Sequence, residues 1–353
     1  MKIIRELNDI NFFKIENNCI YFKDDKGIWE DFGYDSKLIS DDPSASNIIV
    51  YDENHIILDN LNRPISYYGD IFDALKTEKT NIRISGILGN ILIYYMKAPK
   101  YMCGLFDLLN SVFTEFDKDY FEYFFKPNFY STLGGYITAL NTEKILWQYT
   151  IPSGIYDWID GSGRTYQGEI DRIIGVYNKV IWISLNSGRL LGLSIKNSAL
   201  IYNISQPNQY PVGYVLREEN KYLWYGRYLQ LDINKGVLFG LNSNFYFEIE
   251  LNNINNFTLY DISESCKYWN IKANMAVLEW AWYDDEIFFG ENLTKGNTVG
   301  IFNKKKKEII WADKIGRAGN NGVTIQKIDY SEGRLYVLDG ENTLHIFERE
   351  KEN

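Results

Sequence analysis

The 353-residue sequence has few of the residues from which metal centres, disulfide frameworks and many catalytic sites are built. Its three cysteines, Cys19, Cys103 and Cys266, are far apart and form no CxxC pair, which argues against a disulfide framework or a structural zinc site. The two histidines, His55 and His345, are too few for a histidine-rich metal site, and a Ser-His-Asp triad would have to use one of them. Both lie in strand-like segments, so we expect packed histidines, no metal and no cofactor.

Long apolar runs are also missing. The longest, residues 84–96, is interrupted and too short to cross a bilayer. Residues 1–18 lack the apolar core and small-residue cleavage site of a signal peptide. We therefore expect a cytoplasmic protein.

Positive charge is outnumbered, with 37 basic against 47 acidic residues and a net charge of −10. Such a surface disfavours nucleic acid and anionic lipid, since both attract basic proteins. The one basic run, residues 303–308 (NKKKKE), lies between two strand-like segments and is expected to form a solvated hairpin turn. A basic protein is the partner that this charge favours.

Aromatic residues, by contrast, make up 16% of the chain and fit pleated, half-buried surfaces. Short apolar strands recur on either side of a polar turn rich in Asn, Asp and Gly, residues that tight hairpins need. Eight such hairpins have their second strands near positions 20, 56, 91, 129, 180, 237, 287 and 335. In the later units, a further strand pair ends on an aromatic residue: Trp147, Tyr202, Tyr260 or Trp311.

Four strands per unit, at a spacing of about 40–55 residues, are typical of a β-propeller. The sequence therefore predicts an all-β fold, a single propeller domain over residues 1–353 with seven four-stranded antiparallel blades; eight is the alternative. Residues 120–350 carry the pattern clearly and residues 11–119 weakly. Residues 1–10 resemble a lone strand that pairs with the last unit and closes the ring, which would hide two sheet edges.

One segment carries a more specific signal. Residues 135–147, GYITALNTEKILW, resemble the repeat of the quinoprotein-type (PQQ-like) and WD-repeat-like propeller superfamily, and residues 192–202 and 300–311 are looser copies. The sequence departs from that repeat at the turn, where Glu143 and Lys196-Asn197 replace the usual glycine. The resemblance implies the fold and no particular activity, because propellers serve enzymes, assembly factors and inhibitors alike.

The loop at residues 156–172 (YDWIDGSGRTYQGEIDR) is the main candidate site. A calcium loop starting at Asp160 lacks acids at alternate positions, a phosphate cradle lacks the third glycine and a following helix, and a sialidase-type Asp box has one residue too many. Two interpretations stay open: a glycine-rich turn whose aspartates cap backbone donors, or an exposed recognition loop. The residues predicted to bind a partner are Asp157, Trp158, Asp160, Arg164 and Tyr166, together with Trp224 and Arg227 of a second long connector.

A second aromatic cluster surrounds Trp280 and Trp282, which point the same way if they lie in a strand. Packing between blades and a place at the channel mouth are both open for them. The residues therefore favour a non-catalytic, monomeric, protein-binding propeller, and more concretely an immunity protein that neutralises a basic toxin or secreted effector. The alternative is a propeller enzyme that cleaves glycans with paired carboxylates.

Overall fold

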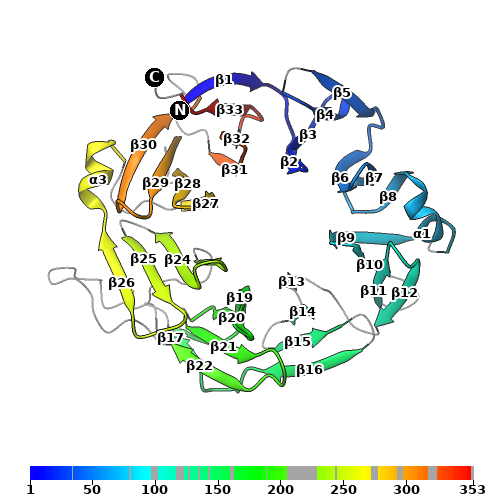
Figure 1. Ribbon diagram of the computed structural model, residues 1–353. Helices are drawn as coiled ribbons and strands as arrows, with labels where there is room; N and C mark the ends of the chain where they lie inside the picture. The colour runs from blue at the N-terminus through cyan, green and yellow to red at the C-terminus, as the bar shows by residue number, and fades with distance from the viewer. Residues whose placement is uncertain are drawn as a thin grey trace.

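The computed structural model consists of sheets arranged in a ring (Figure 1). It describes residues 1–33, 35–78, 81–96, 102–116, 123–125, 128–133, 136–141, 144–159, 163–187, 189–204, 229–242, 245–271, 277–291, 297–316 and 324–350. In this part of the chain, seven four-stranded antiparallel sheets form blades, as the sequence predicted. A three-stranded sheet takes a further place in the ring.

We name each blade by its first strand. The first half of the ring contains β2 (Phe12–Glu16), β3 (Cys19–Asp24), β4 (Gly27–Asp31) and β5 (Ser36–Ser40); β6 (Ala45–Tyr51), β7 (Asn54–Asp59) and β8 (Pro64–Tyr68); β9 (Ile82–Leu88), β10 (Ile91–Met96), β11 (Met102–Asp107) and β12 (Val112–Phe116); and β13 (Tyr123–Phe125), β14 (Asn128–Leu133), β15 (Tyr136–Leu140) and β16 (Ile145–Thr150). The second half contains β19 (Ile170–Tyr177), β20 (Val180–Leu185), β21 (Leu190–Ser194) and β22 (Leu200–Ile204); β23 (Leu229–Asp232), β24 (Val237–Asn242), β25 (Phe245–Glu250) and β26 (Phe257–Asp261); β27 (Val277–Tyr283), β28 (Glu286–Glu291), β29 (Thr298–Asn303) and β30 (Glu308–Lys314); and β31 (Ile325–Ser331), β32 (Arg334–Asp339) and β33 (Leu344–Glu348), to which β1 (Lys2–Leu7) is added.

The hairpins expected from the sequence join the first two strands of these sheets. Their turns adopt the left-handed backbone that Asn, Asp and Gly tolerate, as at Asn17, Asn178 and Asp284. The aromatics Trp147, Tyr202, Tyr260 and Trp311 lie on the last, outer strands β16, β22, β26 and β30, as predicted.

The three-stranded sheet β6–β8 explains why the first units looked short. After β8, the chain forms the 3-10 helix η1 (Asp70–Phe72) and the helix α1 (Asp73–Glu78) before β9 begins. Phe72 and Leu75 are fully buried against the neighbouring sheet. The apolar side chains of this helical segment thus help to cover a sheet at the place where the other units have a fourth strand.

The N-terminal strand closes the ring as expected. β1 pairs antiparallel with β33, from Lys2 opposite Glu348 to Leu7 opposite Leu344, with an irregularity between Ile3 and Arg5. Figure 1 shows the two chain ends side by side at this blade. The first strand of the chain thus completes the last blade and closes the ring.

The apolar core is divided into clusters, most of which bridge two neighbouring sheets. One joins Tyr130 and Trp147 of the β13 blade to Ile181 of the β19 blade, and another joins Phe239 of the β23 blade to Phe289 of the β27 blade. Because most sheets are covered on both faces, their middle strands are apolar at almost every position; all six residues of β20 are buried.

A recurring cross-strand pair shows why small residues stand in the third strands. Tyr94 lies opposite Gly104, Tyr130 opposite Ala139, Trp182 opposite Gly192 and Phe289 opposite Gly300. A Cβ added at Gly104 would lie 2.2 Å from Cζ of Tyr94, and one added at Gly300 would lie 2.3 Å from Cζ of Phe289. The repeat thus keeps room for a buried ring beside the third strand.

Candidate functional site

The predicted recognition loop contains a small hairpin that belongs to no blade. β17 (Trp158–Ile159) pairs with β18 (Thr165–Tyr166), with Trp158 opposite Tyr166. This hairpin was not predicted; the sequence suggested a turn because its two strands are only two residues long and contain no alternation. We call it the connector hairpin, since it lies between the outer strand β16 and the inner strand β19.

The base of the connector hairpin is fixed to the ring. Oδ1 of Asp157 accepts a hydrogen bond from the backbone N–H of Gly168 at 3.2 Å, so this aspartate caps a backbone donor, one of the two roles considered. Tyr156 is buried, and the guanidinium carbon of Arg189 lies 5.4 Å from the centre of its ring. The base of the connector hairpin is therefore held in place by these contacts.

The structure places several of the predicted partner-binding residues together. Asp157, Arg164 and Tyr166 are exposed on the connector hairpin or at its base, and Tyr166 is 38% exposed. The backbone of Trp158 lies in β17. Asp160, Trp224 and Arg227, and the side chain of Trp158, lie outside what the structure describes.

The faces of the ring follow from strand direction. In each blade the first strand starts at the face where the long connectors lie and ends at the face where the first hairpin turn lies. We call these the connector face and the hairpin face. Two of these connectors carry exposed apolar or aromatic residues: Ile155, 63% exposed, follows β16, and Tyr268, 82% exposed, ends α3 (Ser263–Tyr268), which follows β26.

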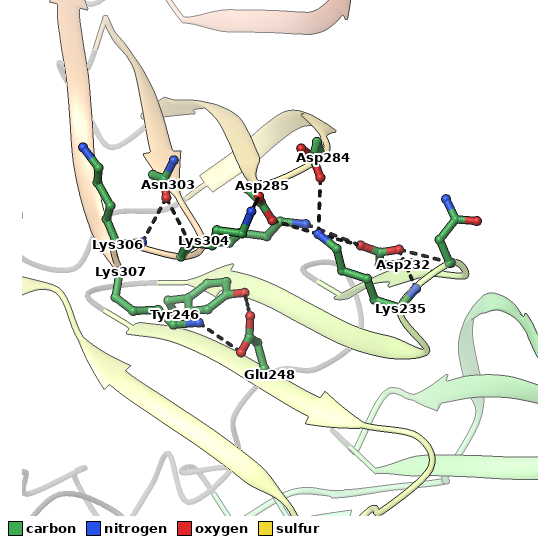
Figure 2. Close-up of polar contacts among 12 residues, drawn as sticks. Asp232, Lys235, Tyr246, Glu248, Asp284, Asp285, Asn303, Lys304, Lys306 and Lys307 are labelled. Atoms are coloured by element: carbon green, nitrogen blue, oxygen red, sulfur yellow. Dashed lines mark hydrogen bonds and ion pairs between the residues drawn. The ribbon is translucent and has the colours of Figure 1, made fainter.

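A second polar site lies on the hairpin face, between the β23 and β27 blades (Figure 2). A cavity of about 350 Å³ is lined by acids and lysines above an apolar wall: Asp232, Lys235, Val237, Phe239, Glu248, Asp285, Lys304, Lys305 and Lys307. We call it the lysine cavity. Sequence reasoning missed it because its residues come from three turns and three strands of two neighbouring blades.

Lys304 is the least expected member of the lysine cavity. The basic run does form a hairpin turn, between β29 and β30, but the prediction that it is solvated is wrong for Lys304, which is 5% exposed. Its Nζ lies 4.1 Å from the ring centre of Phe239 and 4.7 Å from that of Trp282. The aromatic rings favour a cation over their faces.

Burial is the main influence on the titration of Lys304. It lowers the pKa of this ammonium, and the nearby Lys235 lowers it further, while Asp232, Asp285 and Glu248 act in the opposite direction. The net result is a pKa below that of an ordinary lysine.

The other lysines of the cavity are paired. Nζ of Lys235 lies 2.8 Å from Oδ1 of Asp285, which also contacts Lys305. Nζ of Lys307 lies 3.0 Å from Oε2 of Glu248 and 4.4 Å from the ring centre of Tyr246. These pairs tie the turns of the two blades together.

The same contacts bear on paired-carboxylate chemistry. Hydrogen bonds from Lys235 and Lys305 hold the pKa of Asp285 below its usual range. A general acid needs a carboxyl group that stays protonated, so Asp285 does not fit that role. Asp284 lies in the same turn and contacts Lys235 at 3.3 Å.

Both histidines lie in strands, β7 and β33, as predicted. The ring of His55 stacks on Tyr68 with 4.3 Å between centres, and burial lowers its pKa. His345 lies between two carboxylates: Nε2 is 2.8 Å from Oδ2 of Asp339, and Nδ1 is 2.7 Å from Oε1 of Glu6. Since both ring nitrogens face a carboxylate, His345 joins the closing strand to its blade.

Trp280 and Trp282 contribute to packing between blades, one of the two places considered for them. Both rings meet Phe239 of the β23 blade edge to face, at 6.0 and 5.2 Å, so they point the same way, as predicted. Among the described residues, we find no group of three or more His, Cys, Asp or Glu side chains arranged to hold a metal ion. The helices in the described part of the chain are too short or too polar to span a membrane.

Comparison with known proteins agrees with the fold. No protein-family model matches the chain, and no curated protein sequence matches it. Similar solved structures include a computationally designed protein, Ika8, at 10% identity and a TM-score of 0.59, covering 99% of this chain and 98% of that one. They also include BamB from Moraxella catarrhalis, a PQQ-like propeller, at 10% identity and a TM-score of 0.56, covering 98% and 99%.

A third similar structure is the C-terminal WD40 domain of Sif2, at 9% identity and a TM-score of 0.55, covering 98% of this chain and 97% of that domain. These likenesses extend over nearly the whole chain. They confirm the propeller fold implied by the PQQ-like and WD-repeat-like resemblance.

Proposed function

We propose that this chain is a protein-binding β-propeller that recognises its partner with the connector face. The observation that carries the proposal is the connector hairpin, a two-stranded sheet outside the blades on which Arg164 and Tyr166 are exposed. A tyrosine and an arginine on a rigid support are the residue types that dominate binding energy at protein interfaces. Ile155, three residues before the hairpin begins, adds exposed apolar surface.

The ring supports this role physically. Recognition loops work best on a scaffold that does not move, and here most sheets are packed on both faces by fully buried side chains. Anchoring of the hairpin base by Asp157 and Tyr156 reduces the ordering cost on binding.

A finer proposal concerns the partner. The net charge of −10 favours a basic protein, because opposite charge speeds encounter. We propose an immunity protein that acts in the cytoplasm as a monomer and blocks a basic toxin or secreted effector. Coexpression with a toxin encoded beside it tests this directly, since an immunity protein restores growth.

The test of the broader proposal is affinity capture from the native cell with matched variants. We expect the wild-type chain to retain a partner that is lost with Tyr166→Ala and weakened with Arg164→Ala. A hot-spot tyrosine contributes roughly 1–3 kcal/mol, or about five- to 150-fold in Kd. The control is Ile233→Ala, which removes a residue that is 60% exposed on the hairpin face.

All variants should melt like the wild type, so that a loss of binding reports contact and not unfolding. If Tyr166→Ala and Ile233→Ala retain the partner equally well, the connector hairpin is not the recognition element. If Ile233→Ala alone loses it, the partner binds the opposite face.

A further inference from the structure

Lys304 combines burial, an accessible cavity and an incomplete set of hydrogen bonds. Its nearest carboxylate is Oδ2 of Asp232, at 3.8 Å, which is too far for a hydrogen bond. Among the described residues, no acceptor lies within hydrogen-bonding distance of its Nζ. The other lysines of the cavity that bear an ion pair reach a carboxylate at 3.0 Å or less.

Burial of an ammonium without a hydrogen-bond acceptor disfavours its charged form relative to that of an exposed lysine. Burial and the Lys235 charge lower the pKa of Lys304 accordingly. The neutral amine of a lysine is a nucleophile that reacts with carbonyl carbon. Phe239 and Val237 supply an apolar wall of the cavity against which a ligand can pack.

We propose that Lys304 is a carbonyl-capturing nucleophile, whose side-chain amine condenses with a small apolar aldehyde held in the lysine cavity. The nitrogen lone pair forms the C–N bond, the C–O bond breaks, and the two protons of the amine leave with the carbonyl oxygen as water. The product is an imine. The step consumes no oxidant or reductant, and it is independent of partner binding at the connector face.

The volume of the cavity limits the ligand. A cavity of about 350 Å³ accommodates an aldehyde about the size of benzaldehyde, whose ring matches the aromatic wall. Lys235, Lys305 and Lys307 are each engaged by a carboxylate in an ion pair, whereas the amine of Lys304 has no carboxylate within hydrogen-bonding distance among the described residues.

The experiment is site-resolved labelling of the folded, full-length chain with benzaldehyde and cyanoborohydride, which reduces the imine to a stable benzyl amine. Digestion at acidic residues and fragmentation then compare Lys304 with Lys306, an exposed lysine two positions away in the same turn. We expect Lys304 to be labelled faster than Lys306 at pH 7, because a lowered pKa gives more free amine at that pH. The rate at Lys304 should also saturate with benzaldehyde concentration.

Variants separate capture in the cavity from general reactivity. Val237→Phe fills the cavity and should reduce labelling of Lys304 to the rate of Lys306, whereas Lys306→Arg should leave it unchanged. Lys304→Arg should abolish the benzyl adduct at position 304. Equal labelling of Lys304 and Lys306 in the wild type would overturn the proposal. A labelling rate at Lys304 that stays linear in benzaldehyde concentration, or that Val237→Phe does not change, would show that the cavity does not bind the aldehyde.

Discussion

Replacing His345 with leucine should destabilise the ring in a pH-dependent way. His345 is 3% exposed and lies between Asp339, which is buried, and Glu6, whose side chain is 52% exposed. The loss of a partner for a buried charge costs about 3–5 kcal/mol, and the loss of an exposed one costs about 0–1 kcal/mol. Asp339 keeps two backbone donors, Glu341 and Thr343, so we expect the lower end, about 3 kcal/mol.

The pH dependence follows from the direction of the pKa shift. Burial lowers the pKa of His345, but the hydrogen bonds and charges of Asp339 and Glu6 outweigh it, so the net shift is upward. A raised histidine pKa contributes stability that is complete below the unfolded value of about 6.5 and is lost as the pH rises through the folded value. A neutral imidazole has one N–H, so above that pH one carboxylate loses its donor.

Urea unfolding at pH 5.5 and pH 8.5 measures the effect. The stability gap between wild type and His345→Leu should be about 3 kcal/mol at pH 5.5, near 4 °C in Tm if the ring unfolds as one unit. It should shrink at pH 8.5 by about 1.4 kcal/mol for each unit by which the folded pKa exceeds the unfolded one. Asp339, whose pKa is lowered, stays ionised at both pH values.

The second histidine provides the control. Burial lowers the pKa of His55, so its contribution falls as the pH drops below about 6.5. The difference in unfolding free energy between wild type and His55→Leu should therefore be smaller at pH 5.5 than at pH 8.5, the opposite of the change expected for His345→Leu. If the difference in unfolding free energy between wild type and His345→Leu is equal at pH 5.5 and pH 8.5, a protonated His345 bonded to both Glu6 and Asp339 is refuted.

Two other changes test the ring's construction. Deleting residues 1–8 removes β1, its pairing with β33 and the Arg5–Asp31 ion pair at 2.5 Å. The deletion should lower the Tm by several degrees in a thermal melt. An unchanged Tm would contradict the role of β1 in closing the ring. Gly192→Ala places a Cβ within 3 Å of Tyr202 and should destabilise by about 1–3 kcal/mol in urea, whereas Gly86→Ala, which has open space around it, should change stability by less than about 0.5 kcal/mol. Equal effects at the two glycines would show that the third strand needs no such room.

Much of the fold could be predicted because its signals are local. A tight turn depends on a few adjacent residues. Asn17, Asn18 and Asn178 adopt the left-handed backbone that such turns require, so their presence in the sequence predicts a turn. The outer-strand aromatics follow from the same short repeat. The segment at residues 70–78 could not be predicted in this way, since its helices are stabilised by the burial of Phe72 and Leu75 in a neighbouring sheet.

The sequence contains a further local signal for the turn between the second and third strands. Leu58-Asp59 and Leu338-Asp339 end the second strand of their units, and each aspartate accepts hydrogen bonds from backbone donors of the next turn. This recurring Leu-Asp step would have marked the turn between the second and third strands. It would also have placed Asp339 beside the strand that carries His345.

The candidate sites depended on contacts between blades, which the sequence does not reveal. A run of four lysines predicts a hairpin turn correctly, because Oδ1 of Asn303 accepts hydrogen bonds from the backbone N–H groups of Lys305 and Lys306 and starts the turn. Whether the first lysine then lies in solvent depends on Phe239, 65 positions earlier, whose ring lies under its Nζ.

Strand direction separates the two sites and connects the two experiments. Each first strand starts at the connector face and ends at the hairpin face, so Tyr166, in the connector before β19, lies toward one face and Lys304, in the turn between β29 and β30, lies at the other. A partner held by the connector hairpin leaves the lysine cavity open to small molecules. Labelling of Lys304 in the partner-bound chain therefore reports which face the partner covers: undiminished labelling places it on the connector face, and protection of Lys304 places it on the hairpin face.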